Sequence, residues 1–265
     1  MIEATLAAAA FGNRPGCWPL PTATTPQQLW LRAVAAGGQG RYGSARGDLE
    51  ALMRGGPAGR LASLAHSTQG SFLRQLGWHT LARRWDGRAL ALAGSDPEAG
   101  ADALIGLAAD ALGVGRFAAA ATLLSRAEPV VAAAPAHRLA LRRSWVAAEL
   151  AMAAGAGASA VRYAEAAVEL AGGAVGGAGS ARHQVKSQMV LAAALCSAGD
   201  IGQARVVGDT ALEAAGELGL VPLRWALACL LAETGSGAHS AQELRTLRDE
   251  CADRVRHAGG NWRVG

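Results

Sequence analysis

The stretch LIGLAADALGVGRFAAAATLLSRA, residues 104–127, consists of two apolar segments separated by the short break Gly113–Gly115. Alanine and leucine favour helices and glycine ends them, so the stretch predicts two helices joined by a tight turn. Its central alanine, Ala120, recurs along the chain. The six recurring alanines lie at spacings of 37, 38, 40, 44 and 37 residues and are Ala45, Ala82, Ala120, Ala160, Ala204 and Ala241.

A glycine precedes most of these marker alanines by five residues. The glycines are Gly40, Gly77, Gly115, Gly155 and Gly199. A self-similar period in this range is typical of stacked helical hairpins, in which each hairpin buries its apolar face against its neighbours. The sequence therefore predicts an all-α fold, a right-handed solenoid of about six helix-turn-helix repeats.

The pattern of apolar residues and breakers predicts the bounds of the paired helices. The first helices are expected near 26–37, 60–76, 96–113, 136–154, 180–198 and 221–234. The second helices are expected near 41–54, 78–93, 116–128, 158–171, 201–217 and 239–257. Residues 1–24, interrupted by Pro15, Pro19 and Pro21, predict a disordered leader before a repeat domain at 25–258, and residues 259–265 a short tail. The glycine-rich joint 172–179 is interpreted as a loop insertion, with a hinge as the alternative.

The unit around Ala120 resembles a tetratricopeptide (TPR) repeat. Large and small apolar positions follow one another at TPR-like spacing from Leu104 through Gly115 and Ala120 to Leu124 and Ala127. The average spacing of about 39 exceeds the 34 residues of a standard repeat, so the likeness is to the looser arrays of bacterial regulatory proteins. The resemblance covers residues 26–257 and implies a protein that binds other molecules. The last hairpin departs from the pattern, with Arg245 and Arg248 at apolar positions, and is expected to cap the stack.

Composition limits the class of protein. The chain has 265 residues, a net charge of +4, abundant alanine and glycine, and Lys186 as its only lysine, which is typical of a GC-rich bacterial genome. Four scattered cysteines without a CxxC pair argue against a zinc site and fit a reducing compartment. No long uninterrupted apolar run and no basic leader occur, so we expect a cytoplasmic protein without membrane association.

Motifs of catalysis are missing from the sequence. The six histidines lie in different units, and HExxH, GxSxG and the phosphate-binding P-loop do not occur. Asp96, Glu98, Asp102 and Asp110 lie on one predicted helix and are interpreted as a solvated helix start. We therefore expect no enzyme activity, no cofactor and no metal site. The sequence pattern does not indicate whether a small ligand binds.

Residues at equal offsets from the marker alanines should lie side by side on the first helices, which line the concave face of a TPR-like stack. At 22 residues before the marker are Arg60, Glu98, Arg138 and Arg182, and at 18 before are Asp102, Arg142 and Lys186. Trp145 and Met189 share a third offset, and Glu149 follows Trp145 by one turn. The predicted partner-binding groove thus comprises Arg138, Arg142, Trp145, Glu149, Arg182, Lys186 and Met189.

Such a groove suits a protein partner with an acidic, partly apolar segment, because arginine and lysine orient the acid while Trp and Met supply contact area. The leading hypothesis is an adaptor or regulatory protein. In the alternative, Trp145 and Met189 belong to the core and the cations are solvated.

A second cluster is expected on the convex face and comprises Arg83, Arg84, Trp85 and Arg88. A nucleic-acid-associated regulator would use such a cluster to contact phosphates. The oligomeric state stays open.

Overall fold

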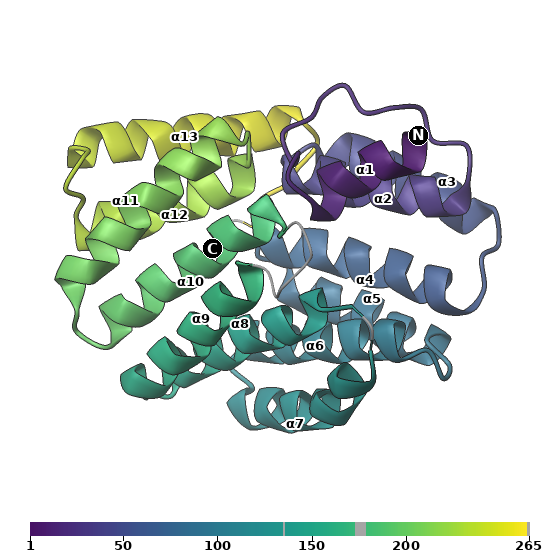
Figure 1. The fold of residues 1–265 in the computed structure, drawn as a ribbon, viewed down its shortest axis with the longest axis horizontal. Coiled ribbons are helices and arrows are strands. Elements are labelled where there is room, and N and C mark those ends of the chain that lie inside the picture. Colours follow the sequence, from purple (N-terminus) through teal and green to yellow (C-terminus); the bar gives the residue numbers. More distant parts are fainter. Residues whose placement is uncertain (135, 173–178, 264–265) are drawn as a thin grey trace.

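We describe the protein from a computed structural model, which describes residues 1–134, 136–172 and 179–263. These residues form helices and turns without a strand (Figure 1). The predicted all-α class is therefore confirmed. Within the described residues no helix is both long enough and apolar enough to cross a lipid bilayer. Most of the glycine-rich joint predicted as a loop or hinge, residues 173–178, lies outside the described residues.

Twelve helices form the six predicted hairpins, and consecutive helices pack against each other along the chain. The first helices are α2 (Pro26–Gly38), α4 (Gly59–Gln75), α6 (Pro97–Gly113), α8 (Arg138–Ala153), α10 (Ala181–Ser197) and α12 (Val221–Thr234). The second helices are α3 (Tyr42–Arg54), α5 (His79–Leu92), α7 (Phe117–Ala133), α9 (Gly157–Ala171), α11 (Ile201–Glu217) and α13 (Ala241–His257). The predicted bounds agree to within two residues, except that α7 continues beyond residue 128 through Pro129.

The glycines before the marker alanines end the first helices by one shared geometry. Gly40, Gly77, Gly115, Gly155 and Gly199 all have positive φ, between 71° and 89°. The residue after each glycine donates its backbone N–H to the carbonyl five positions earlier, as Arg116 does to Ala111 at 2.8 Å. This is the Schellman C-cap, which needs a left-handed residue and so favours glycine. The repeated glycine therefore sets the same turn in every hairpin but the last.

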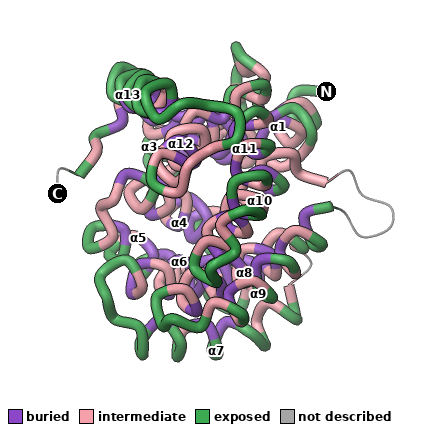
Figure 2. Tube along the Cα trace, turned by 90° about the vertical axis from the view of Figure 1, so that its left-hand side faces the viewer, coloured by how far each residue is buried: buried purple, intermediate pink, exposed green. Residues whose placement is uncertain are grey.

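The marker alanine is the fourth residue of each second helix from α3 to α11, and all five are buried. In the last hairpin the pattern is different. Ala241 is exposed as the first residue of α13, and the fourth position is Leu244, which is 1% exposed. The sixth marker is thus Leu244 rather than Ala241. The remaining surface of α13, which includes Arg245, is mostly exposed like that of α7 (Figure 2), in line with a polar capping helix.

The leader predicted to be disordered contains a helix, α1 (Ile2–Phe11). Leu6, Ala9 and Ala10 form its buried face, which packs against α2 in one apolar core cluster. The following segment is also held: the side chain of Gln39 donates to the carbonyls of Pro15 and Cys17 at 2.8 and 3.0 Å. The sequence-based prediction is wrong here because tertiary contacts, which the local pattern does not reveal, order this segment.

The end of the chain connects the last hairpin to the first two. The amide of Gly43 donates to Ala258 at 2.7 Å, and the amide of Arg263 donates to Leu76 at 2.9 Å. Trp262 also stacks on Trp225, with ring centroids 4.2 Å apart. The solenoid therefore curls until the C-terminal end of α13 meets the start of α3, and its concave face becomes the interior of a ring.

Candidate binding pocket

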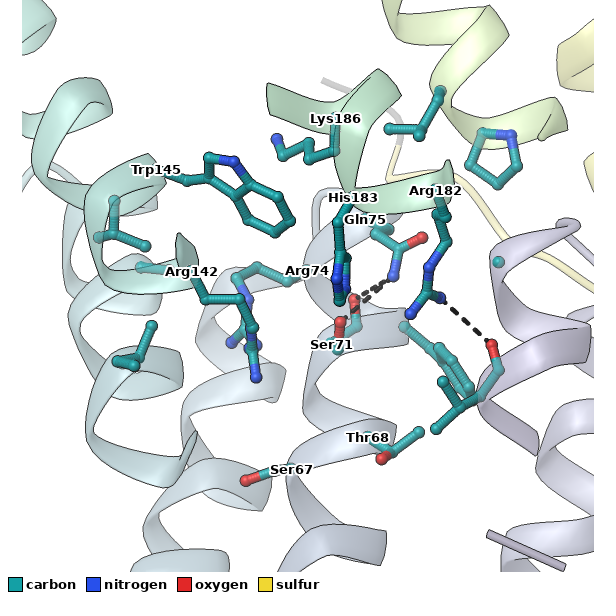
Figure 3. A pocket seen from close by; sticks show the side chains of 18 of the residues that line it. Ser67, Thr68, Ser71, Arg74, Gln75, Arg142, Trp145, Arg182, His183 and Lys186 are labelled. Atoms are coloured by element: carbon teal, nitrogen blue, oxygen red, sulfur yellow. Dashed lines mark hydrogen bonds between the residues drawn. The ribbon is translucent and has the colours of Figure 1, made fainter. Parts of the chain in front are cut away.

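A pocket of about 490 Å³ occupies the concave side of the ring, and all six first helices contribute to its wall. Figure 3 shows polar and aromatic side chains from several helices pointing into it. Phe11 of α1 and His79 at the start of α5 also line it. The volume falls in the range of small-ligand sites in proteins, about 300–1,000 Å³. The ring arrangement thus converts an open groove into a bounded site.

All seven residues of the predicted groove line this one pocket. Four of them lie on α8: Arg138, Arg142, Trp145 and Glu149. The other three lie on α10: Arg182, Lys186 and Met189. Residues at equal offsets come together here because the hairpins repeat with nearly constant geometry. Whether these residues bind a partner stays a prediction.

Residues at equal distances from the marker alanines lie side by side most clearly in a row of ion pairs across three first helices. Glu98 on α6 accepts from Arg60 on α4 at 2.6 Å and from Arg138 on α8 at 2.7 Å. The two ion pairs outweigh burial, which by itself would raise the pKa of Glu98, and lower that pKa. The three side chains occupy the same offset and lie side by side, as expected.

The carboxylates of α6 are a correction to the sequence interpretation. Glu98, Asp102 and Asp110 are buried rather than solvated, and only Asp96 caps the helix by accepting from the amide of Ala99. Asp102 pairs with both Arg138 and Arg142. The helix-start pattern misled because the wall of the ring buries α6 on several sides.

Arg182 differs from the other cations of the pocket. Its guanidinium donates one hydrogen bond, to the carbonyl of Val34 at 3.3 Å, and no carboxylate among the described residues lies within ion-pairing distance. Burial, with repulsion from Arg138, lowers its pKa to about 10. Burial also lowers the pKa of Arg142 to about 10, with Arg74 and Arg182 contributing in the same direction. The pocket thus holds cations that are poorly compensated.

Arg74, which also lines the pocket, belongs to a buried ion triad that the sequence reasoning did not find. Arg74 of α4 pairs with Asp86 of α5 and Asp110 of α6, both at 2.6 Å, and both carboxylates are 0% exposed. Two helical glycines leave the room for Asp86: a Cβ on Gly70 or Gly106 would lie 2.6 or 2.5 Å from its oxygens. The available signal was one glycine within each of the predicted helices α4 and α6, together with an acidic residue on α5.

Aromatic side chains form part of the pocket wall. Trp145 donates to Ser187 at 2.9 Å, packs in the core of α8, α9 and α10, and meets His183 edge to face at 5.5 Å. It is therefore both a core residue and a wall residue, so the two readings of Trp145 are compatible. Phe11 lies 5.5 Å from Trp30, and the guanidinium of Arg138 stands 5.3 Å above its ring. Sequence reasoning missed Phe11 because it placed that residue in a disordered leader.

Two histidines of the pocket wall have lowered pKa values. Burial, together with Arg182, Arg142 and Arg138, lowers the pKa of His183 well below its ordinary value. In Figure 3 its imidazole lies between Arg182 on one side and Arg74 with Arg142 on the other. Burial and Arg74 lower the pKa of His79 as well. The described residues contain no group of three metal-ligating side chains.

No family model and no curated protein matches this sequence. The likeness to TPR repeats therefore rests on the spacing of the small residues and on the six hairpins, and it stays a prediction. What the pocket binds has to be argued from its own chemistry.

The triad makes one pH-dependent prediction. Burial raises the pKa of Asp110 to about 7; Arg74 opposes the rise and Asp86 adds to it. Between its ordinary value of 3.8 and about 7, the unfolded chain has lost this proton while the folded chain keeps it, so stability falls as pH rises. Relative to Asp110→Asn, the wild type should lose at most about 1.4 kcal/mol of unfolding free energy per pH unit.

Urea unfolding of both proteins at pH 5, 6, 7 and 8 measures this difference. His183 and His79 act in the opposite sense, because their lowered pKa values destabilise the fold below the ordinary histidine pKa. They occur in both proteins and cancel in the comparison. A stability difference that stays constant from pH 5 to pH 7 would contradict the assignment.

Proposed function

We propose that this protein is a non-catalytic interaction module of the cytoplasm, an adaptor or regulatory protein with TPR-like repeats. It captures the acidic, partly apolar segment of a protein partner in the pocket of the ring. The observation that carries the proposal is the position of Arg182, a half-buried cation without a carboxylate partner among the described residues. Its guanidinium lies 5.9 Å from the ring of Phe11, in a pocket that Trp145 and Trp30 also line.

The dimensions of the pocket limit how much of the partner enters. A helix about 10 Å wide that rises about 5.4 Å per turn occupies roughly 420 Å³ per turn. A pocket of about 490 Å³ therefore accommodates about one turn, or the tip of an extended segment. The remainder of the partner contacts the rim. This favours capture of an acidic tip over burial of a long helix in the groove.

A pull-down with a single substitution tests the proposal. We expect Arg182→Gln to reduce the retained amount of a discrete protein from nuclease-treated lysate at least about tenfold, because the charge-assisted contact is lost. Arg182 is preferable to the pair Arg142→Glu/Lys186→Glu. A glutamate at 142 would face the buried Asp102 and destabilise the wall.

Arg84→Gln, on the exposed face of α5, is the matched control and should retain the partner. Thermal unfolding should show that both variants melt close to the wild type. Equal capture by Arg182→Gln and wild type, with both folded, would refute the pocket as the capture site.

The alternative is a nucleic-acid-associated regulatory protein. Arg83, Arg84 and Arg88 are exposed on α5, and Trp85 beside them packs 5.4 Å from His66. Basic side chains that neutralise phosphates make binding fall steeply with salt. In the same pull-down this function predicts material that nuclease removes, that Arg84→Gln weakens and that Arg182→Gln leaves unchanged.

A further inference from the structure

The charges around the pocket do not balance. Three separate ion-pair groups and Arg182 together contain six cations and five carboxylates: Arg60, Arg74, Arg138, Arg142, Arg182 and Lys186, with Asp86, Glu98, Asp102, Asp110 and Glu149. Counting each carboxylate as one negative charge, one positive charge remains. The unpaired cation is Arg182. A single negative charge therefore compensates the wall, whereas a dianion would overcompensate it.

Three polar atoms in the pocket wall also lack partners. Ser67 Oγ, Arg74 Nη2 and His79 Nδ1 are buried and have no hydrogen-bond partner among the described residues. These atoms have almost no accessible surface, so a molecule in the pocket does not reach them in this conformation. Arg74 Nη2 lies within the buried triad, whose Asp86 and Asp110 also each have one oxygen without a partner. Arg182 is therefore the cation that the pocket offers to an anionic ligand.

Much of the remaining wall is apolar, although Thr68, Ser71 and Gln75 also line it. Ile105, Leu112, Val146, Met189 and Leu223 line it together with the aromatic rings. Apolar surface of this kind buries a hydrocarbon or aromatic body, while the cations orient its charged end. The wall thus has two chemically distinct parts that a single amphipathic molecule would satisfy.

We propose that the pocket is a receptor site for a small amphipathic monocarboxylic acid, whose carboxylate pairs with Arg182 and whose apolar body packs against Trp145 and Met189. This inference deepens the proposed function by naming its regulation. The small acid and the acidic tip of the protein partner occupy the same subsite, so the acid displaces the partner.

Calorimetric titration at pH 8 with 3-phenylpropionate tests direct binding. For a probe of this size we expect a Kd of about 0.1–1 mM. The neutral 3-phenylpropionamide and the dianionic phenyl phosphate should each bind at least about tenfold more weakly. Equal affinity for the acid and its amide, or no saturable binding of the acid up to about 10 mM, would overturn the inference.

Variants connect the binding to the residue. Arg182→Gln should weaken 3-phenylpropionate binding about 10- to 100-fold, whereas the convex-face control Arg84→Gln should leave it unchanged. Arg182 makes one long hydrogen bond, so its replacement should leave the fold intact. If Arg182→Gln nevertheless melts early, Lys186→Gln serves as the second variant, because Lys186 is half-buried and, among the described residues, pairs with Glu149 alone. Unaltered acid binding in the folded variants would exclude this subsite.

A competition arm separates this inference from the proposed function. Adding 3-phenylpropionate to the pull-down should release the captured protein, and the amide should not. Arg182-dependent acid binding without any captured protein would contradict partner capture and support the small-acid site. The opposite outcome is that capture of the protein depends on Arg182, but the acid does not bind and does not displace the captured protein. This result would support the partner function and refute the small-acid site.

Discussion

Asp86→Ala is expected to lower the free energy of unfolding by about 3–5 kcal/mol, the cost typical of removing one partner of a buried ion pair. Asp86 is 0% exposed and accepts from Arg74 Nη1 at 2.6 Å. The substitution leaves Arg74 with Asp110 as its remaining carboxylate and opens a void between Gly70 and Gly106. A loss of this size is a large fraction of the stability of an ordinary domain.

Urea unfolding at pH 8 measures the effect of Asp86→Ala. Asp253→Ala is the matched control, because Asp253 pairs with Arg256 one turn away on the exposed face of α13. Exposed pairs contribute about 0–1 kcal/mol, so the control should unfold close to the wild type. Asp86→Asn, which keeps the shape and loses the charge, should fall between the two. Equal midpoints for Asp86→Ala and Asp253→Ala would refute the structural role of the triad.

Leu6→Ala is expected to destabilise the protein by about 2–5 kcal/mol, the range for a leucine truncated in a packed core. Leu6 is 0% exposed on α1 and belongs to the same core cluster as Trp30 and Leu31. A disordered leader, which the local sequence suggests, would instead make the substitution silent. The experiment therefore decides between the two descriptions of residues 1–24.

Thermal and urea unfolding of Leu6→Ala provide the measurement. Ile2→Ala on the same helix is the control, because Ile2 is 40% exposed and should change stability by less than about 1 kcal/mol. Since α1 also places Phe11 in the pocket wall, Leu6→Ala should weaken 3-phenylpropionate binding as well. A wild-type midpoint for Leu6→Ala would show that α1 contributes nothing to the fold.

The first and second helices were predictable because their signals are local. Glycine permits the left-handed residue of each C-cap, and small residues such as Ala82 and Ala120 let paired helices approach closely. Proline and acidic residues also marked the start of α6, where Asp96 caps the helix. These properties depend on residues within one turn of each other. The sixth marker failed because α13 begins differently, at the Ser240–Glu243 capping box.

The neighbourhood of the pocket residues was also predictable, since equal positions in repeated hairpins align. Arg60, Glu98 and Arg138 lie in a row for this reason. The pairing within the row was not predictable in the same way. Whether Arg138 faces solvent or a buried Glu98 depends on how tightly the ring closes, and no local pattern encodes that closure. The triad of Arg74, Asp86 and Asp110 was not predictable for the same reason, because it forms only where three helices pack together.

The sequence by itself determined the helices, their turns and the offsets that bring the residues of α8 and α10 together, because backbone propensities and a constant repeat act over short range. The tertiary structure alone decided the rest. A ten-residue alanine-rich helix such as α1 is marginal in isolation and becomes ordered by packing against α2. Small rotations accumulate over the six hairpins until the end of α13 meets the start of α3. This curvature encloses the pocket and leaves Arg182 without a carboxylate partner among the described residues.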